Sequence, residues 1–272
     1  MITLSNINKT FRVAKRQAGF GRAVKALFSR EHELVHALDN VSFKIHDGEM
    51  VGYIGPNGAG KSTTIRMMVG LLRQDTGTIK VCGYDNIAQN VEMKRCIGYV
   101  PDEPLFYENM SGRKYLDFIS DVFDIDQDTR IARIAKWAGR FSLIDALDDK
   151  ISSYSRGMKQ KLGVIAALIH DSRILVLDEP MVGLDPKSAF VLKEVMREFC
   201  NTGGTVFFST HVMDVAERLC DTVGIINKGA LIASGTFASL KESTGENQAT
   251  LEQLFLELTD EEVETNDTHS RV

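Results

Sequence analysis

The chain contains the stretch Gly55-Pro56-Asn57-Gly58-Ala59-Gly60-Lys61-Ser62-Thr63, in which a glycine is followed, after four residues, by glycine, lysine and serine. This spacing is typical of a phosphate-binding loop. Glycine lets the backbone approach an anion closely, so the N–H groups of the loop can form a concave anion site. Lys61 then supplies a positive charge for the β- and γ-phosphates, and the Ser62 hydroxyl can ligate the Mg²⁺ that bridges them.

The residues on either side of this loop have the patterns that the motif requires. Residues 50–54 predict a short buried strand that enters the loop, and residues 64–69 predict a helix that leaves it. This order directs the N-terminus of a helix at the bound phosphates. A glycine-rich turn could match the spacing by chance, but it would not require a strand before it and a helix after it.

Length, charge and cysteine content restrict the class of protein. The 272 residues are 43% hydrophobic, which is enough for one large domain or two small ones with a real core. The net charge of −5 does not favour nucleic acid as a partner. The four cysteines form no Cys-x-x-Cys pair, which indicates reduced thiols in a cytosolic protein rather than disulfides or a zinc site.

The sequence predicts no membrane span of its own. The first residues alternate like a strand and lack the basic and apolar regions of a signal peptide. The longest apolar run, residues 162–169, is far shorter than the roughly 20 residues that cross a bilayer.

Three segments near the loop predict a small antiparallel sheet beside it. Residues 1–11 predict an edge strand that ends at Phe11. Residues 37–45 predict a second strand, which the turn Asp47-Gly48 would close as a hairpin, and residues 78–83 predict a third.

The basic segment 12–36 interrupts this pattern. It contains six Lys and Arg residues and almost no acids before Glu31, and four apolar residues fall at helical spacing: Phe20, Val24, Leu27 and Phe28. One interpretation is an amphipathic element that contacts anionic lipid headgroups or a membrane partner. The other is a surface insertion with a solvated charged face.

The remaining elements predict an α/β fold. Residues 97–104 predict a buried strand ended by prolines, and helical periodicity then runs from Ser111 to about Ala167. The strand at 174–177 is apolar at every position, which is typical of a central strand in a parallel sheet. Further elements are a helix at 187–200, a strand at 205–209, a hairpin at 223–233 and a helix at 251–258.

These elements together predict a P-loop NTPase (RecA-like) core with an antiparallel β subdomain and an inserted helical subdomain. One ATPase domain would cover residues 1–245, with the β subdomain and first part of the core at about 1–100, the helical subdomain at about 102–167 and the rest of the core at about 168–245. Residues 246–272 would hold the short helix and a disordered acidic tail.

Two further segments can contact a bound nucleotide. Asp178 and Glu179 follow the apolar strand, where one carboxylate can hold Mg²⁺ and the next can polarise the water that attacks the γ-phosphorus. Ser155 can cap a helix that begins near Met158, and Gly157 leaves backbone N–H groups open for a second anion. Taken alone, the acids could be a surface turn and the serine an ordinary helix cap.

The order of these segments resembles that of the ATP-binding subunit of an ATP-binding-cassette (ABC) transporter along nearly the whole chain. Residues 55–63 match the Walker A loop and residues 174–180 the Walker B strand. Residues 154–158 match the family signature, which usually reads Leu-Ser-Gly-Gly-Gln. Residues 183–185 match the D-loop, and residues 209–211 match the segment of the switch histidine.

The resemblance implies ATP and Mg²⁺ as cofactors and a role for each matching residue. The catalytic residues would be Glu179, His211 and Lys61, and the metal ligands Ser62, Asp178 and Asp102. The nucleotide contacts would be Phe11, Gly55, Asn57, Gly58, Ala59, Gly60, Lys61, Ser62, Thr63, Ser155, Gly157 and Asp185. Phe11 would stack on adenine or be a core residue, and Asp185 would cap the following helix and also lie at a dimer contact.

Two positions depart from the family pattern. Asp102 stands where the family has the Q-loop glutamine, a contact for the metal and for coupling. A carboxylate can still reach Mg²⁺, but it is charged and shorter. Arg156 stands at the third signature position. The signature Tyr-Ser-Arg-Gly-Met resembles the exporter-type (ABC-2-like) branch, whose membrane subunits are separate polypeptides.

The resemblance also implies partners and a location. The chain would hydrolyse ATP in a head-to-tail dimer with a second ATP-binding subunit, a copy of itself or a close relative. It would drive export by a membrane-spanning permease subunit at the cytoplasmic face of the cell membrane. The alternative is a soluble ABC ATPase, but the sequence shows neither a long coiled coil between the nucleotide motifs nor a second cassette.

Overall fold

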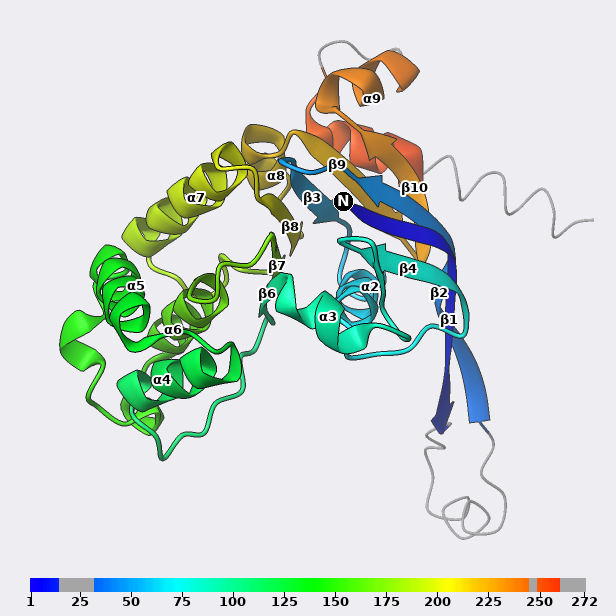
Figure 1. Ribbon diagram of the computed structural model, residues 1–272. Coiled ribbons are helices and arrows are strands. Elements are labelled where there is room, and N and C mark those ends of the chain that lie inside the picture. The colour runs from blue at the N-terminus through cyan, green and yellow to red at the C-terminus, as the bar shows by residue number, and fades with distance from the viewer. Residues whose placement is uncertain (15–31, 245–248, 260–272) are drawn as a thin grey trace, which may run out of the picture.

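Two β-sheets form the centre of the molecule in the computed structural model (Figure 1), which describes residues 1–14, 32–244 and 249–259. The larger sheet has six strands in the order β10-β9-β3-β8-β7-β6. Its strands are β3 (Met50–Ile54), β6 (Ile97–Val100), β7 (Ile174–Asp178), β8 (Thr205–Thr210), β9 (Thr222–Asn227) and β10 (Ala230–Gly235). All neighbours are parallel except β9 and β10, which form the predicted hairpin.

The smaller sheet is antiparallel and confirms the predicted β subdomain. Its order is β2-β1-β4-β5, from β1 (Ile2–Ala14), β2 (His32–Ile45), β4 (Thr76–Val81) and β5 (Tyr84–Asp85). The prediction of residues 1–11 as an edge strand is wrong, because β1 lies between β2 and β4. The predicted hairpin at Asp47-Gly48 is also wrong, because this turn joins β2 to β3 in the other sheet.

The basic segment 12–36 begins and ends as strand. The pairing of β1 with β2 continues to Ala14 and His32, so residues 12–14 and 32–36 extend a long antiparallel hairpin. Val13 and Leu34 on this extension are 48% and 57% exposed. The helix predicted around Phe20, Val24, Leu27 and Phe28 lies outside the described residues, as does the predicted acidic tail from residue 260 onward.

Helices cover both faces of the parallel sheet. The longer ones are α4 (Gly112–Val122), α5 (Gln127–Arg140), α6 (Arg156–Leu168) and α7 (Pro186–Asn201). The shorter ones are α2 (Lys61–Met68), α3 (Asn90–Arg95), α8 (Met213–Leu219), α9 (Phe237–Thr244), the 3₁₀ turns at Ile144–Ala146 and Ile151–Ser153, and a last helix at 251–259. Figure 1 shows α4, α5 and α6 gathered at the end of the molecule away from the antiparallel sheet.

The helical block is where predicted, but its apolar faces are only partly covered. Leu116 and Ile134 are buried, whereas Phe118, Val122 and Ile131 are 43%, 53% and 58% exposed. In the described part of the chain, no helix combines the length and the apolar content needed to cross a membrane.

The strands of the parallel sheet separate two apolar cores. Tyr53 and Phe207 pack on one face with residues of α2 and the antiparallel sheet. Met50 and Phe208 face the opposite core, which contains residues of α6 and α7. Because both faces are covered, the parallel strands are apolar at nearly every position.

Candidate nucleotide site

The loop between β3 and α2 is shaped by contacts that only glycine permits. Gly58 and Gly60 have φ angles of 83° and 110°, in the left-handed region. A Cβ on Gly60 would lie 2.7 Å from Cδ2 of Leu38, and one on Gly55 would lie 2.2 Å from the carbonyl oxygen of Ile226. Strand β2 and the β9–β10 hairpin therefore press against the back of the loop. Next to Gly58 the space is open within 4 Å.

The ammonium group of Lys61 lies inside this loop. Its Nζ donates hydrogen bonds to the carbonyl oxygens of Gly55 (2.7 Å) and Pro56 (3.2 Å), and only 6% of the residue is exposed. It also lies 3.4 Å from Oε1 of Glu179. A buried cation at the N-terminus of α2 makes this loop suited to bind an anion.

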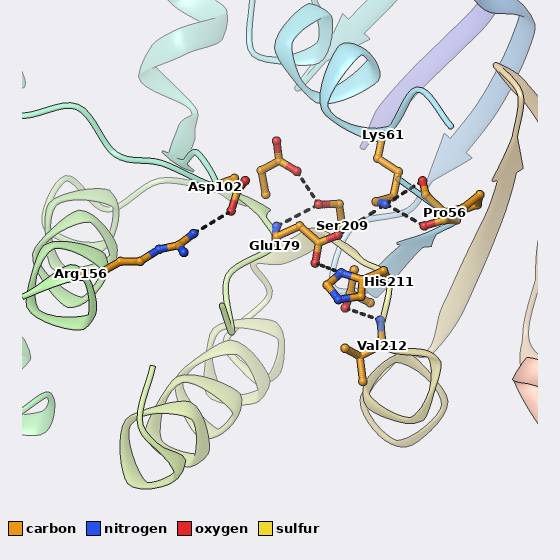
Figure 2. A network of polar contacts seen from close by, with 11 residues as sticks. Pro56, Lys61, Asp102, Arg156, Glu179, Ser209, His211 and Val212 are labelled. Carbon is orange, nitrogen blue, oxygen red and sulfur yellow. Dashed lines mark hydrogen bonds and ion pairs between the residues drawn. The ribbon is translucent and has the colours of Figure 1, made fainter. Parts of the chain in front are cut away.

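The ends of β3, β6, β7 and β8 bring the other predicted residues to the same edge, because the carboxyl ends of parallel strands meet there. Asp178, the last residue of β7, is opposite Ser209 of β8. The Ser209 hydroxyl donates to Oδ1 of Asp178 at 2.6 Å and accepts from the backbone N–H of Glu179 at 2.9 Å. One buried serine thus holds both acids. Figure 2 shows Ser209 beside Glu179.

Glu179 connects two cationic or polar partners. Its Oε2 lies 2.9 Å from Nδ1 of His211, which follows β8, while its Oε1 faces Lys61. The Oε1 atom is buried without a hydrogen-bond partner in the structure. The backbone of Glu179 has a φ of 47°, an uncommon value for a residue with a side chain. Strain of this kind gathers at functional sites.

Asp102 lies at the same edge but is held by a different element. Its Oδ1 is 3.8 Å from Nη2 of Arg156, the first residue of α6. Burial and the negative charge of Asp178 raise the pKa of Asp102, and Arg156 opposes this shift. Figure 2 shows Arg156 reaching Asp102 from the side opposite Lys61.

The signature segment and the D-loop form one surface. Ser155 caps α6, as predicted, by accepting a hydrogen bond from the Met158 N–H at 3.2 Å. A Cβ on Gly157 would lie 2.8 Å from the carbonyl oxygen of Gly183. Ser155 and Arg156 are exposed, so this surface is available to a partner.

Asp185 caps α7, as predicted. Its Oδ1 accepts from the Ser188 N–H at 3.0 Å and its Oδ2 from the Ser188 hydroxyl at 2.5 Å. Oδ2 also lies 3.3 Å from the Lys161 ammonium on α6. The hydrogen bonds from Ser188, with Lys161, hold the pKa of Asp185 well below its usual value.

The other residues predicted to contact the nucleotide differ in how far they are exposed. Asn57 and Gly58 are exposed at the tip of the loop, Ala59 is buried, and Ser62 and Thr63 are half-buried in the first turn of α2. Phe11 pairs with Val35 in the β1–β2 hairpin, where the Lys9 ammonium lies 5.5 Å from its ring centre. Its stacking on adenine stays a prediction.

The chemistry of these groups fits a magnesium–nucleotide complex. Among the described residues there is no cluster of three or more His, Cys, Asp or Glu side chains that could hold a metal. Mg²⁺ commonly binds through one or two carboxylates together with the phosphates of a substrate. Asp178 supplies such a carboxylate, and it is 98% buried with one hydrogen-bonded oxygen, Oδ1.

Similarity to known proteins identifies the family. The family model described as "ABC transporter" matches residues 38–182, more than half of the chain. The chain belongs to the ABC transporter family. It is 35% identical over 230 residues to the ABC transporter ATP-binding protein NatA of Bacillus subtilis (strain 168), a match that covers 84% of this chain and 93% of NatA.

Solved structures agree with this assignment. An ATP-binding subunit of an ABC transporter has a TM-score of 0.82 and 29% identity, covering 95% of this chain and 99% of that one. A dimeric ATP-binding cassette in a post-hydrolysis state with ADP and phosphate has a TM-score of 0.72 at 22% identity, covering 87% and 98%. The family match and the similarity to NatA make this ABC protein an ATP-binding, ATP-hydrolysing subunit of a transporter, which confirms the predicted class, and the solved structures agree in fold.

Two contacts of this ABC site cannot be predicted from the sequence. Ser209 reads as part of a buried strand until the register places it opposite Asp178. The pairing of Lys161 with Asp185 joins two helices whose contact no local pattern predicts. The sequence indicates Ser209 only as part of the segment 209–211 that matches the switch histidine and as a polar residue near the end of an apolar strand.

Proposed function

We propose that this subunit hydrolyses ATP between two cassettes and couples the reaction to export by a separate permease. The observation that carries the proposal is the division of the predicted machinery. Lys61, Asp178, Glu179 and His211 are joined by direct contacts or through Ser209, whereas Ser155 is exposed at the start of another helix. A second subunit that presents its own Ser155 would complete the site.

Within one subunit, each group has a distinct task. Lys61 would hold the β- and γ-phosphates of the substrate in place of the carbonyl oxygens that it now contacts. Ser62 and Asp178 would hold Mg²⁺, with Asp102 as a further carboxylate nearby. When bound, Mg²⁺ would supply the positive charge that stabilises negative charge on the phosphates.

Glu179 would orient and deprotonate the attacking water. The carboxylate is fixed at the strand end by the Ser209 contact to its backbone and by His211 at 2.9 Å. His211 would donate to the γ-phosphate once Glu179 turns to the water. Positioning of this kind accounts for most of the rate in phosphoryl transfer.

An apolar groove supports docking of a permease. It has a volume of about 350 Å³ and lies between the core and the helical subdomain, lined by Tyr99, Pro101, Phe106, Tyr115 and Ile119, among others. Leu105 at its rim is 92% exposed. The groove begins at the same loop as Asp102, so a partner seated there would act directly on the catalytic edge at the cytoplasmic face of the membrane.

The catalytic assignment is tested with Glu179→Gln. This variant keeps the shape of the side chain but removes the base, so we expect nucleotide affinity within a few-fold of wild type and a turnover lower by two or more orders of magnitude. Glu194→Gln, the same change on the exposed face of α7, is the matched control and should turn over normally. Near-normal turnover in Glu179→Gln would remove Glu179 from its proposed role.

Dimer formation is tested in the Glu179→Gln background, in which substrate is bound but not consumed. Light scattering should show one copy without nucleotide and two with Mg²⁺ and ATP. Adding Ser155→Arg should abolish the dimer while each subunit still binds nucleotide. A dimer that survives Ser155→Arg would contradict the head-to-tail arrangement.

The permease contact is tested by co-purification. We expect a polytopic membrane protein to co-purify with the subunit from detergent extracts, and Leu105→Asp to abolish this co-purification.

A further inference from the structure

The two positions that depart from the family pattern contact each other. Arg156 Nη2 lies 3.8 Å from Asp102 Oδ1, and Figure 2 shows the two side chains directed at one another. Asp102 follows the end of β6, and Arg156 is the first residue of α6. The ion pair therefore connects the parallel sheet to the helical subdomain at the edge where the catalytic residues lie.

Each member of the pair also has other neighbours at the catalytic edge. A Cβ on Gly183 would lie 3.2 Å from Cδ and 3.3 Å from Cγ of Arg156, so the methylene stem of the arginine runs along the D-loop. The negative charges of Asp178 and Glu179 both act on Asp102 and raise its pKa. The guanidinium group thus faces one carboxylate of an acidic edge, at Asp102, while Lys61 faces another, at Glu179.

We propose that Arg156 is a positioning residue that holds Asp102 and offsets its charge, so that the two residues together set how strongly the site takes a divalent cation with its nucleotide. This inference rests on the proposed function, because it requires the cation to bind at Asp178. The sign of each effect follows from electrostatics. Removing the guanidinium strengthens the attraction for a divalent cation and weakens that for a metal-free triphosphate, and removing the carboxylate does the opposite.

The experiment measures metal binding rather than turnover. Mn²⁺ is titrated into the full chain with a non-hydrolysable ATP analogue and followed by electron paramagnetic resonance. Arg156→Gln should lower the half-saturating Mn²⁺ concentration about threefold to tenfold, and Asp102→Asn should raise it by a similar factor. With a chelator present and no metal, Arg156→Gln should lower the affinity for the analogue and Asp102→Asn should raise it. Arg156→Lys, which keeps the charge, should stay within about twofold of wild type.

A double variant tests whether the two residues act as a unit. Asp102→Gln combined with Arg156→Gly gives this chain the usual family residues at both positions. It should bind Mn²⁺ within about twofold of wild type, although each single change shifts binding. Arg113→Gln is the matched control, because Arg113 also forms an exposed ion pair, 2.7 Å from Asp148 on the helical subdomain, and loses the same charge. It should leave Mn²⁺ binding unchanged.

The outcomes separate this inference from the function on which it rests. Shifts of the same sign in Arg156→Gln and Asp102→Asn, or an Arg156→Gln variant that behaves like Arg113→Gln, would overturn the role of Arg156. A wild-type chain that binds neither the analogue nor Mn²⁺ would instead overturn the proposed site. Both side chains of the pair are substantially exposed, at 61% and 47%, so their loss should alter stability little.

Discussion

Ser209→Ala should weaken the fold and the site together. The hydroxyl donates to Oδ1 of Asp178 at 2.6 Å and accepts from the Glu179 N–H at 2.9 Å. Ser209 is fully buried and Asp178 is 2% exposed, so bulk water does not reach the lost contact. A hydrogen bond to a charged group contributes about 1.5–3 kcal/mol, and a buried group left unpaired costs about 1–3 kcal/mol. Because one hydroxyl makes both contacts, we expect Ser209→Ala to lower the free energy of unfolding by about 3 kcal/mol.

Denaturation of the full chain without nucleotide measures this loss. For a chain of this size about 1 kcal/mol lowers the thermal midpoint by about 2–4 °C, so Ser209→Ala should lower it by about 6–12 °C. Ser120→Ala is the matched control, because Ser120 is also fully buried. Its hydroxyl donates to the Leu116 carbonyl at 2.8 Å, an oxygen one helical turn earlier. Its removal should cost less than about 1 kcal/mol.

The same variant should lower turnover about tenfold or more, since Glu179 loses the contact that fixes its left-handed backbone. If Ser209→Ala is no less stable than Ser120→Ala and turns over at the wild-type rate, Asp178 and Glu179 do not depend on Ser209. The reasoning from buried hydrogen bonds would then fail at its central step.

Two further predictions concern other parts of the fold. Gly55→Ala would place a Cβ 2.2 Å from the Ile226 carbonyl oxygen, so nucleotide binding should be lost in a fluorescence titration. Gly139 lies on helix α5, and a Cβ there would meet no atom closer than Cδ1 of Ile144 at 3.5 Å. Gly139→Ala should therefore raise the free energy of unfolding by about 0.5–1 kcal/mol. Burial lowers the pKa of His170, and the hydrogen bond between its Nε2 and the Ile97 carbonyl, at 3.0 Å, opposes this shift. Its neutral form is therefore favoured by folding, and denaturation should show stability falling as the pH drops below about 6.5. His170→Gln should reduce that fall, and an unchanged pH dependence would assign it to other groups.

The local parts of the site could be predicted from the sequence, because each depends on a short stretch of chain. The loop at 55–63 carries its own spacing, and the apolar strand at 174–177 is followed at once by Asp178 and Glu179. Parallel strands then bring their ends to one edge by topology alone. For this reason the structure brings Lys61, Glu179 and His211, which the sequence assigns to one site, within contact distance of one another, and their catalytic roles stay predictions.

Long-range pairing could not be predicted in this way. The register of β1 against β2 extends to Ala14 and His32, beyond the strand that the sequence predicts to end at Phe11. The turn at Asp47-Gly48 has hairpin composition, yet the strands it joins enter different sheets. Period-3.6 patterns predicted the helices at Phe118 and Ile131 but not that both residues would remain exposed, because periodicity says which face is apolar and not what covers it.

The contacts of Lys61 would link substrate binding to release of Glu179, the proposed catalytic base. Without a ligand, its ammonium group is occupied by two loop carbonyls and by Glu179 at 3.4 Å. A triphosphate that takes Lys61 must replace these contacts, so its net affinity is smaller than the gross attraction between the charges. The same replacement removes one of the two groups that face the Glu179 carboxylate and leaves His211 as the other. If Glu179 acts on water as proposed, filling the loop would free its carboxylate from Lys61 and so couple catalysis to occupancy of the site.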